Sequence, residues 1–327
     1  MNSALSGAPA PELSDNLRGL QIPHIGVLTR EQLDEAIHLG EWFRDNRYDT
    51  TYVDLLKGRV QVLLFVYEST RTRMGFEAAM AQLGGTNTYL AVKDTQMGRG
   101  ESMADTARAL DQFVDVFSGR LWSQDDIEAA CEHMTVPVLN ACTPVDHTTH
   151  VLGELMAIKQ AKGSLDGLNL VYTGMARGIM HSFIRVCPVL GTNLVVAVPE
   201  SYAETIDQDI LKEGKLKAEK TGSRLEVCTD LKKAVEGADF VQAATLMRSM
   251  LAGEQSPEEQ AVDVPNWTVT DEVLDCATSD VLYSHSGPAH RGVCATDKVL
   301  DGERSIVREE ARNAIFSKKA LLALTVR

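Results

Sequence analysis

Residues 65–77 read F-V-Y-E-S-T-R-T-R-M-G-F-E, and within them a strand pattern gives way to a helical pattern. An apolar run of strand length covers residues 60–67, and helical spacing of apolar residues follows over 70–84. Working outward, the same alternation predicts further strands at 86–92, 114–118, 136–139, 168–172, 193–197, 225–228, 240–243 and 281–284. It predicts further helices at 102–112, 124–134, 148–162, 178–190, 204–222, 230–236 and 305–325, and Thr29 with Gln32 forms a capping-box pattern that opens another.

Two such series of strands and helices predict an α/β protein with two doubly wound parallel-sheet domains. In these sheets ligands bind outside the carboxyl ends of the strands. A cleft between the two domains is therefore where we expect the chemistry.

The first helical turn after residue 68 carries the chemistry of a phosphate site. A helix N-terminus presents unpaired N–H groups and the positive end of its dipole. Hydroxyl groups come from Ser69, Thr70 and Thr72, and the guanidinium of Arg71 can hold a phosphate in a bidentate fork. Arg73 points to another side of the helix, so we expect it to form an ion pair.

The composition of the chain argues against some classes of binding partner. The 327 residues carry 32 Lys and Arg against 46 Asp and Glu, a net charge of −14. A negative chain disfavours nucleic acid and anionic membrane surfaces, although local arginines can still bind an anionic substrate. The six cysteines show neither C-x-x-C pairing nor metal-ligand spacing. With no apolar run of membrane length and no signal-peptide pattern, these features predict a cytoplasmic protein.

Several motifs, in order along the chain, resemble those of the aspartate and ornithine carbamoyltransferases. The first is S-T-R-T-R followed by M-G-F-E-A-A-M-A-Q-L-G-G. The others are D-T-Q-M-G-R-G-E-S-M-A-D-T-A-R-A-L at 94–110, D-H-T-T-H-V-L-G-E-L at 146–155 and H-S-G-P-A-H-R-G at 285–292. The tail V-L-D-G-E-R-S-I-V-R-E-E-A-R-N is closest to the ornithine branch.

The resemblance implies an architecture and a reaction. A carbamoyl-phosphate-binding domain would span 1–147 plus 305–327, with the last helix crossing back to it, and an acceptor-binding domain would span 148–304. The reaction would be transfer of a carbamoyl group from carbamoyl phosphate to a small amine-type acceptor, in a homotrimer. It requires no cofactor, no metal and no covalent intermediate.

The resemblance also assigns roles to residues. Thr72, Arg120 and His147 would converge on the carbonyl oxygen, where negative charge builds up in the transition state. The phosphate would be held by Ser69, Thr70, Arg71, Thr72 and Arg120, with Arg291 as a further contact to phosphate or carbamoyl. Gln96 and Arg99, in the loop before residue 102, would complete the site of the neighbouring subunit.

Two departures from the family pattern affect the donor site. His150 stands where the family has a glutamine that accepts a hydrogen bond from the carbamoyl NH2 group. A histidine can accept that bond only through a neutral ring nitrogen, and another possibility is that it helps to remove the amine proton. Gly100 stands where the family has a lysine, and the adjacent Arg99 can supply that charge.

The residues of the expected acceptor pocket differ more strongly from the family pattern. Where the ornithine branch has D-x-W-x-S-M-G, this chain reads Q-A-A-T-L-M-R-S-M-L at 242–251, with no carboxylate for an α-ammonium. Ser286 and Gly287 replace the Cys and Leu of H-C-L-P, and Arg177 and Arg248 are left as positive groups. We therefore expect an acceptor other than ornithine or aspartate. The alternatives are a changed acyl-phosphate donor on the same scaffold, or a non-catalytic protein that binds a phosphate ligand.

Overall fold

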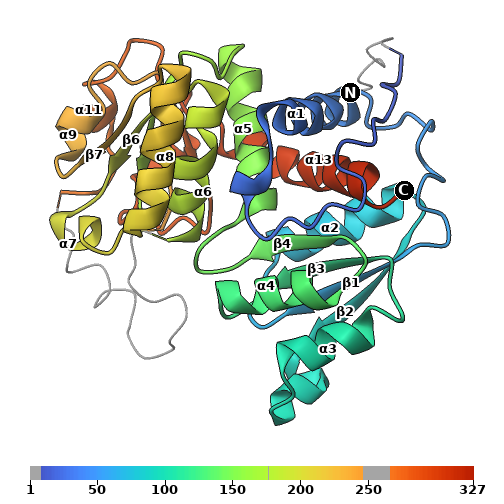
Figure 1. The fold of residues 1–327 in the computed structure, drawn as a ribbon. Helices are drawn as coiled ribbons and strands as arrows, with labels where there is room; N and C mark the ends of the chain where they lie inside the picture. The colour runs from blue at the N-terminus through green and yellow to red at the C-terminus, as the bar shows by residue number, and fades with distance from the viewer. Residues whose placement is uncertain (1–8, 176, 246–265) are drawn as a thin grey trace. The chain divides into compact units, whose positions relative to one another are not determined.

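The computed structural model describes residues 9–175, 177–245 and 266–327, which form two α/β units (Figure 1). The first unit runs to Met156 and also includes Ala311–Arg327, and the second is Ala157–Glu310. The divisions fall inside the helices α5 (Thr148–Lys162) and α13 (Val307–Thr325). They lie nine and six residues later than the boundaries expected at 147 and 304.

The first unit is built on a four-stranded parallel sheet in the order β2-β1-β3-β4. Its strands are β1 (Val60–Phe65), β2 (Thr86–Ala91), β3 (Val116–Arg120) and β4 (Val138–Cys142). Its helices are α1 (Arg30–Asp45), α2 (Arg71–Gln82), α3 (Met103–Leu110) and α4 (Gln124–His133), and the first half of α5 and most of α13 belong to the same unit. Apolar side chains of β1 are buried along almost its whole length, as expected for an inner parallel strand.

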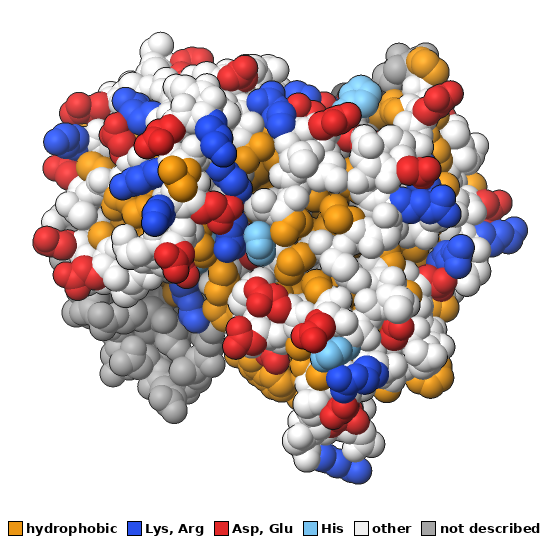
Figure 2. Space-filling view, viewed as in Figure 1, with side chains coloured by type: hydrophobic (Ala, Val, Ile, Leu, Met, Phe, Trp, Pro, Cys, Tyr) orange, Lys and Arg blue, Asp and Glu red, His pale blue; other side chains and the backbone are white. Residues whose placement is uncertain are grey.

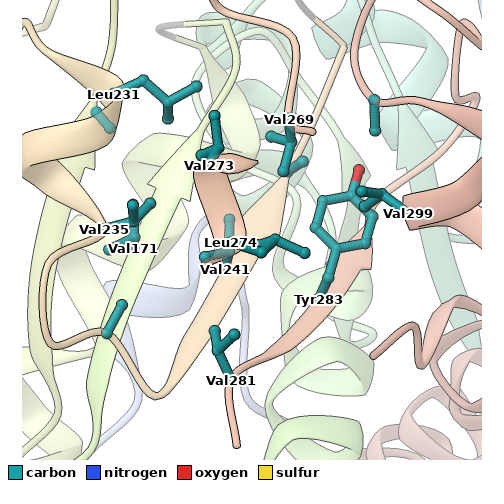
Figure 3. Packing of buried hydrophobic residues seen from close by; sticks show 14 of the residues in the cluster. Val171, Leu231, Val235, Val241, Val269, Val273, Leu274, Val281, Tyr283 and Val299 are labelled. Atoms are coloured by element: carbon teal, nitrogen blue, oxygen red, sulfur yellow. The ribbon is translucent and has the colours of Figure 1, made fainter. Parts of the chain in front are cut away.

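The second unit holds a five-stranded parallel sheet in the order β7-β6-β5-β8-β9. Its strands are β5 (Asn169–Thr173), β6 (Asn193–Ala197), β7 (Leu225–Cys228), β8 (Phe240–Ala243) and β9 (Leu282–His285). Its helices include α6 (Gly178–Val186), α7 (Glu200–Ala203), α8 (Gln208–Thr221), α9 (Leu231–Ala234), α11 (Asp271–Leu274) and α12 (Asp297–Asp301). Figure 3 shows one face of this sheet, where Tyr283 and Val299 pack with the apolar side chains of α11.

The structure confirms the expected fold class and all nine expected strands, with ends shifted by at most three residues. It also confirms the capping box, because Thr29 accepts from the Gln32 N–H and the Gln32 side chain accepts from the Thr29 N–H. The short helices α7, α11 and α12 have too few turns to show a periodic pattern in the sequence.

The final helix returns to the first unit, as expected. The Ser317 hydroxyl donates to the Thr149 carbonyl over 3.0 Å, which ties α13 to the start of α5. Gly153 faces the same helix, since a Cβ there would lie 3.1 Å from the Ser317 hydroxyl oxygen. The close approach of these two helices sets the position of the first turn of α5, which carries the histidines discussed below.

The surface is mixed in charge. On the face shown in Figure 2, basic and acidic side chains are interspersed over the described residues. Within the described part of the chain, no helix combines the length and the apolar character needed to cross a bilayer.

Candidate active site

The predicted phosphate loop connects β1 to α2. The strand ends at Phe65 and the helix begins at Arg71, one residue after the start of the range 70–84 where we expected it. Thr70 occupies the N-cap position but its side chain makes no capping hydrogen bond, so the hydroxyl does not occupy the N–H groups of the first turn. Thr72 is buried and Arg71 is exposed. The helix end is therefore open to an anion.

Arg73 forms the expected ion pair. Its Nε lies 2.8 Å from Oε1 of Glu77, one turn further along α2, and its guanidinium stacks on the ring of Tyr89 at 3.6 Å from the centroid. Both contacts hold this arginine on the β2 side of the helix. Arg73 is thus engaged within the first unit, two residues away from the exposed Arg71.

Arg120 is brought to the phosphate loop by the register of the sheet. It is the last residue of β3 and pairs with Phe65, the last residue of β1, and the Val66 N–H donates to the Arg120 carbonyl over 2.9 Å. Its Nε is buried and has no hydrogen-bond partner among the described residues. A buried guanidinium nitrogen without a partner is costly unless an anion binds there.

His147 and His150 lie at the entrance to α5, which follows β4. Both rings are largely buried and stack with their centroids 4.9 Å apart and an interplanar angle of 26°. The preceding Asp146 fixes the turn, because its carboxylate accepts from the Thr148 hydroxyl and from the Ile25 N–H. The carboxyl ends of β1, β3 and β4, which are neighbours in the sheet, therefore deliver the predicted donor residues to one edge.

The electrostatic environment keeps the His147 ring neutral. Burial is the largest cause that lowers the pKa of His147 well below 6.5, followed by His150 and the positive charges of Arg120, Lys318 and Arg71. A neutral imidazole can donate one N–H to an oxygen without carrying a charge of its own. Positive groups and a neutral imidazole, the residue types predicted for a phosphate and a carbonyl oxygen, are thus gathered in the first unit.

Two further residues of this cluster were not predicted from the sequence. Glu154, one turn after His150, places its Oε1 3.2 Å from the His150 Nε2. Lys318 of α13 is 1% exposed, and burial lowers its pKa to about 7 while Glu154 acts to raise it. The four-residue spacing between His150 and Glu154 was a sequence signal for the first of them, whereas Lys318 stands in a mixed polar and apolar stretch and reads as an ordinary lysine.

The loop after β2 carries Gln96 and Arg99 in a short 3-10 helix (η3, Gln96–Arg99). Its buried Met97 anchors it in the core of the first unit, while Gln96 and Arg99 are exposed. Gly100 closes this turn with a φ of 96°, a left-handed conformation that disfavours a side chain. The glycine at the family's lysine position thus has a structural explanation.

The acceptor-side residues belong to the second unit. Arg177 is the N-cap residue of α6, and its side chain makes no capping hydrogen bond. The Ser286 hydroxyl accepts from Gln242 Nε2 over 3.1 Å, and Gly287 has a φ of 58° and donates its N–H to His285 Nδ1. Arg248 lies outside the described residues.

Arg291 is engaged elsewhere. Its guanidinium lies 2.7 Å from Asp297 and 2.8 Å from Asp301, and these two carboxylates raise its pKa further above the usual value. In this arrangement the guanidinium is bound within the second unit. A contact with phosphate or carbamoyl would require it to leave both aspartates, so that role stays a prediction.

Gly174, in the loop after β5, allows two strand ends to approach. A Cβ at this position would lie 2.9 Å from the carbonyl oxygen and from the Cβ of Ala244, and φ is 147°.

Gly174→Ala is expected to destabilise the protein by about 2–4 kcal/mol, from backbone strain plus overpacking. Gly100→Ala is the matched control, because its φ is also positive but its Cβ would meet nothing within 4 Å. It should cost only about 1 kcal/mol. Thermal unfolding measures both, and equal losses would contradict the clash at Ala244.

Comparison with known proteins covers nearly the whole chain. Residues 21–160 match the family described as aspartate/ornithine carbamoyltransferase, carbamoyl-P binding domain, and residues 166–325 match its Asp/Orn binding domain. The ornithine carbamoyltransferase of Oceanobacillus iheyensis is 33% identical over 306 residues, which cover 94% of each chain. That of Pyrococcus horikoshii is 36% identical over 270 residues, 83% of this chain and 84% of that one. The solved structure of ornithine carbamoyltransferase from Pyrococcus furiosus has a TM-score of 0.89 at 32% identity and covers 95% of this chain and 98% of its own.

These relatives contradict the expectation of an acceptor other than ornithine or aspartate. Relatives that are 33–36% identical over most of this chain are ornithine carbamoyltransferases. They also give no support for a changed donor or for a non-catalytic binding protein. The expectation rested on the motif at 242–251, most of which lies in residues 246–265, outside the described part of the chain, and on the replacements Ser286 and Gly287 and the leftover Arg177 and Arg248.

Proposed function

Since the chain belongs to the aspartate/ornithine carbamoyltransferase family and is a carbamoyltransferase, we propose that it transfers the carbamoyl group of carbamoyl phosphate to the side-chain amine of ornithine. The observation that carries this proposal is the gathering of Arg71 and Arg120 around a neutral His147 in the first unit. The activity of the relatives supports ornithine as the acceptor.

In the proposed reaction the neutral amine nitrogen attacks the carbonyl carbon, and a C–N bond forms. Negative charge builds up on the carbonyl oxygen, where Thr72, Arg120 and His147 donate hydrogen bonds. The C–O bond to phosphate then breaks, and the proton lost by the amine leaves with the departing phosphate. Arg71, with the hydroxyls of Ser69 and Thr70 and the open end of α2, stabilises the phosphate as it leaves.

On the acceptor side, we assign the α-carboxylate of ornithine to the guanidinium of Arg177. The support is its place at the start of α6, directly after the loop that follows β5, where ligands of doubly wound sheets bind. Ser286 and Gly287, after β9, would line the same pocket from a neighbouring strand end. In the sheet, β8 lies between β5 and β9 and pairs with both, which supports placing Arg177, Ser286 and Gly287 around one pocket.

Steady-state kinetics tests the function directly. With saturating carbamoyl phosphate, ornithine is expected to give a kcat/KM of about 10⁴ M⁻¹s⁻¹ or higher. Citrulline and phosphate should form in equal amounts. Aspartate and putrescine serve as comparison acceptors, because each lacks one of the charged groups of ornithine. Turnover of either one at a higher kcat/KM than ornithine would contradict the proposal.

We also propose a homotrimer in which the loop bearing Gln96 and Arg99 completes the site of a neighbouring subunit. The loop follows β2, the edge strand of the sheet, and its two polar side chains are exposed. β3, which carries Arg120, is two strands away, or roughly 10 Å at the usual strand spacing.

A further inference from the structure

Asp146 is a fully buried residue that directly precedes His147. Its exposed fraction is 0%, and its Oδ1 accepts two hydrogen bonds that come from distant parts of the first unit. The Thr148 hydroxyl, at the start of α5, donates over 2.5 Å. The Ile25 N–H, which lies 121 residues earlier in the chain, donates over 3.3 Å. One oxygen atom therefore joins the start of α5 to the N-terminal part of this unit.

The segment that supplies this N–H, residues 22–25, is itself fixed along β4, and we call it the entry segment. The Ile22 N–H donates to the Val138 carbonyl over 2.8 Å, and the Ile22 carbonyl accepts from the Asn140 N–H over 3.0 Å. The Pro23 carbonyl accepts from Asn140 Nδ2 over 2.6 Å. Since β4 is the last strand of its sheet, the entry segment covers a free strand edge and forms a fixed support.

The turn at the start of α5 depends on residues other than His147 for its restraint. The His147 carbonyl accepts the first hydrogen bonds of the helix, from the N–H groups of His150 and Val151, which places His147 at the N-cap position. An N-cap residue usually accepts an N–H of the first turn with a side-chain oxygen, which an imidazole lacks. The backbone before it is held instead, because the Asp146 N–H donates to Thr143 Oγ1 over 3.1 Å and the Asp146 carbonyl accepts from the Thr143 N–H over 2.8 Å.

We propose that Asp146 is a positioning residue for carbamoyl transfer, which clamps the start of α5 to the entry segment and so keeps the His147 ring directed at the carbonyl oxygen of the donor. The inference rests on the proposed function, in which that ring donates a hydrogen bond in the transition state. A small displacement of such a donor is costly. Without Asp146, the buried Ile25 N–H and the buried Thr148 hydroxyl would lose their acceptor, and the turn would shift to satisfy them.

Two adjacent threonines provide a matched test. Thr148→Val and Thr149→Val make the same chemical change at the start of α5, at residues that are both 0% exposed. The Thr148 hydroxyl binds Asp146, whereas Thr149 Oγ1 has no hydrogen-bond partner among the described residues. Thr148→Val is expected to lower kcat about 5- to 20-fold with the KM for ornithine nearly unchanged, and Thr149→Val should lower kcat less than twofold. Equal effects of the two variants would contradict the inference.

A matched pair of aspartates separates positioning from a general loss of stability. The Asp111 carboxylate also accepts from a threonine, through the Thr135 N–H over 2.7 Å and the Thr135 hydroxyl over 3.0 Å, but Thr135 precedes β4 whereas Asp146 follows it. Asp146→Ala is expected to lower kcat about 10- to 100-fold, and Asp111→Ala less than threefold, although both variants should have a lower Tm. A loss of kcat in Asp111→Ala as large as that in Asp146→Ala would overturn the proposal.

A double-mutant cycle tests whether the effect passes through His147. In a His147→Ala background there is no ring to position, so adding Thr148→Val should lower the remaining kcat less than about twofold. If Thr148→Val costs as much in this background as in the wild type, it acts on the stability of the turn and the inference is wrong.

Nitrogen NMR reads the state of the His147 ring without any turnover. In ¹⁵N-histidine-labelled protein, the resonances that disappear in His147→Ala belong to His147. Burial is the largest cause that keeps the pKa of this ring well below 6.5, so a ring released from its place in Asp146→Ala should show a pKa closer to 6.5. Wild-type resonances and a wild-type pKa of His147 in Asp146→Ala would refute the inference. If the wild type failed to carbamoylate ornithine, the proposed function would fail, and this spectrum would still decide whether Asp146 holds the ring.

Discussion

Arg120→Ala is expected to lower kcat/KM for carbamoyl phosphate by about 30- to 1000-fold, which corresponds to about 2–4 kcal/mol of transition-state stabilisation. The guanidinium is placed by the pairing of β3 with β1, and its buried Nε has no partner among the described residues. Its removal would take away both the proposed phosphate contact and the proposed donor to the carbonyl oxygen. Steady-state kinetics at varied carbamoyl phosphate measures the loss.

Arg71→Ala should cause a loss of similar size, mainly as weaker donor binding. Arg73→Ala is its matched control, because the two arginines lie two residues apart in α2. Arg73 is committed to Glu77 and to the Tyr89 ring, so its removal should change kcat/KM less than about threefold. If Arg73→Ala costs as much as Arg71→Ala, the loss reflects the stability of the helix. If Arg71→Ala or Arg120→Ala keeps the wild-type value, the phosphate site lies elsewhere.

The sequence predicted the fold because each element carries its own local signal. The apolar runs of β6, β7 and β8 were placed to the residue, and α5 was placed with both ends correct. Short helices such as α12 lack that signal, and sheet order depends on contacts that no single segment encodes. The meeting of the predicted donor residues at one edge of the sheet could be anticipated for a related reason, since they follow directly after the ends of β1, β3 and β4.

Charges that meet across helices could not be predicted. Glu154 and Lys318 are far apart in sequence, and only the packing of α13 on α5 brings their charges into interaction. Lys318 reads as an ordinary surface lysine until its helix is known to be buried. The partner of a buried charge is a tertiary property, so a motif cannot reveal it.

The expectation about the acceptor was wrong because it treated the lack of a carboxylate at 243–249 as decisive. An ammonium has three donors, and neutral oxygens such as carbonyls and hydroxyls can accept them. The second unit also buries Glu310, which accepts hydrogen bonds from the Ser284 hydroxyl and from Gln242 Nε2. That carboxylate lies 68 residues from Gln242 in the sequence, so inspection of one short motif overlooks it.

Mixing two inactive variants is expected to restore activity if the loop acts on a neighbouring subunit. Arg71→Ala disables the phosphate site of its own subunit, and the double variant Gln96→Ala/Arg99→Ala disables the loop. The activity of each parent variant should be lower than that of the wild type by on the order of tenfold or more. After the two are denatured and refolded together in equal amounts, about one quarter of the sites in a randomly assembled closed trimer would combine an intact phosphate site with an intact loop.

The expected activity of the mixture is therefore about one quarter of the wild-type value, above the mean of the two parents. The structural reason is the position of the loop after the edge strand β2, where Met97 is anchored in the core while Gln96 and Arg99 remain exposed. A loop that served its own subunit would leave every site defective, and the mixture would show only the parental mean. Sedimentation of the active species as a monomer would exclude the shared site altogether.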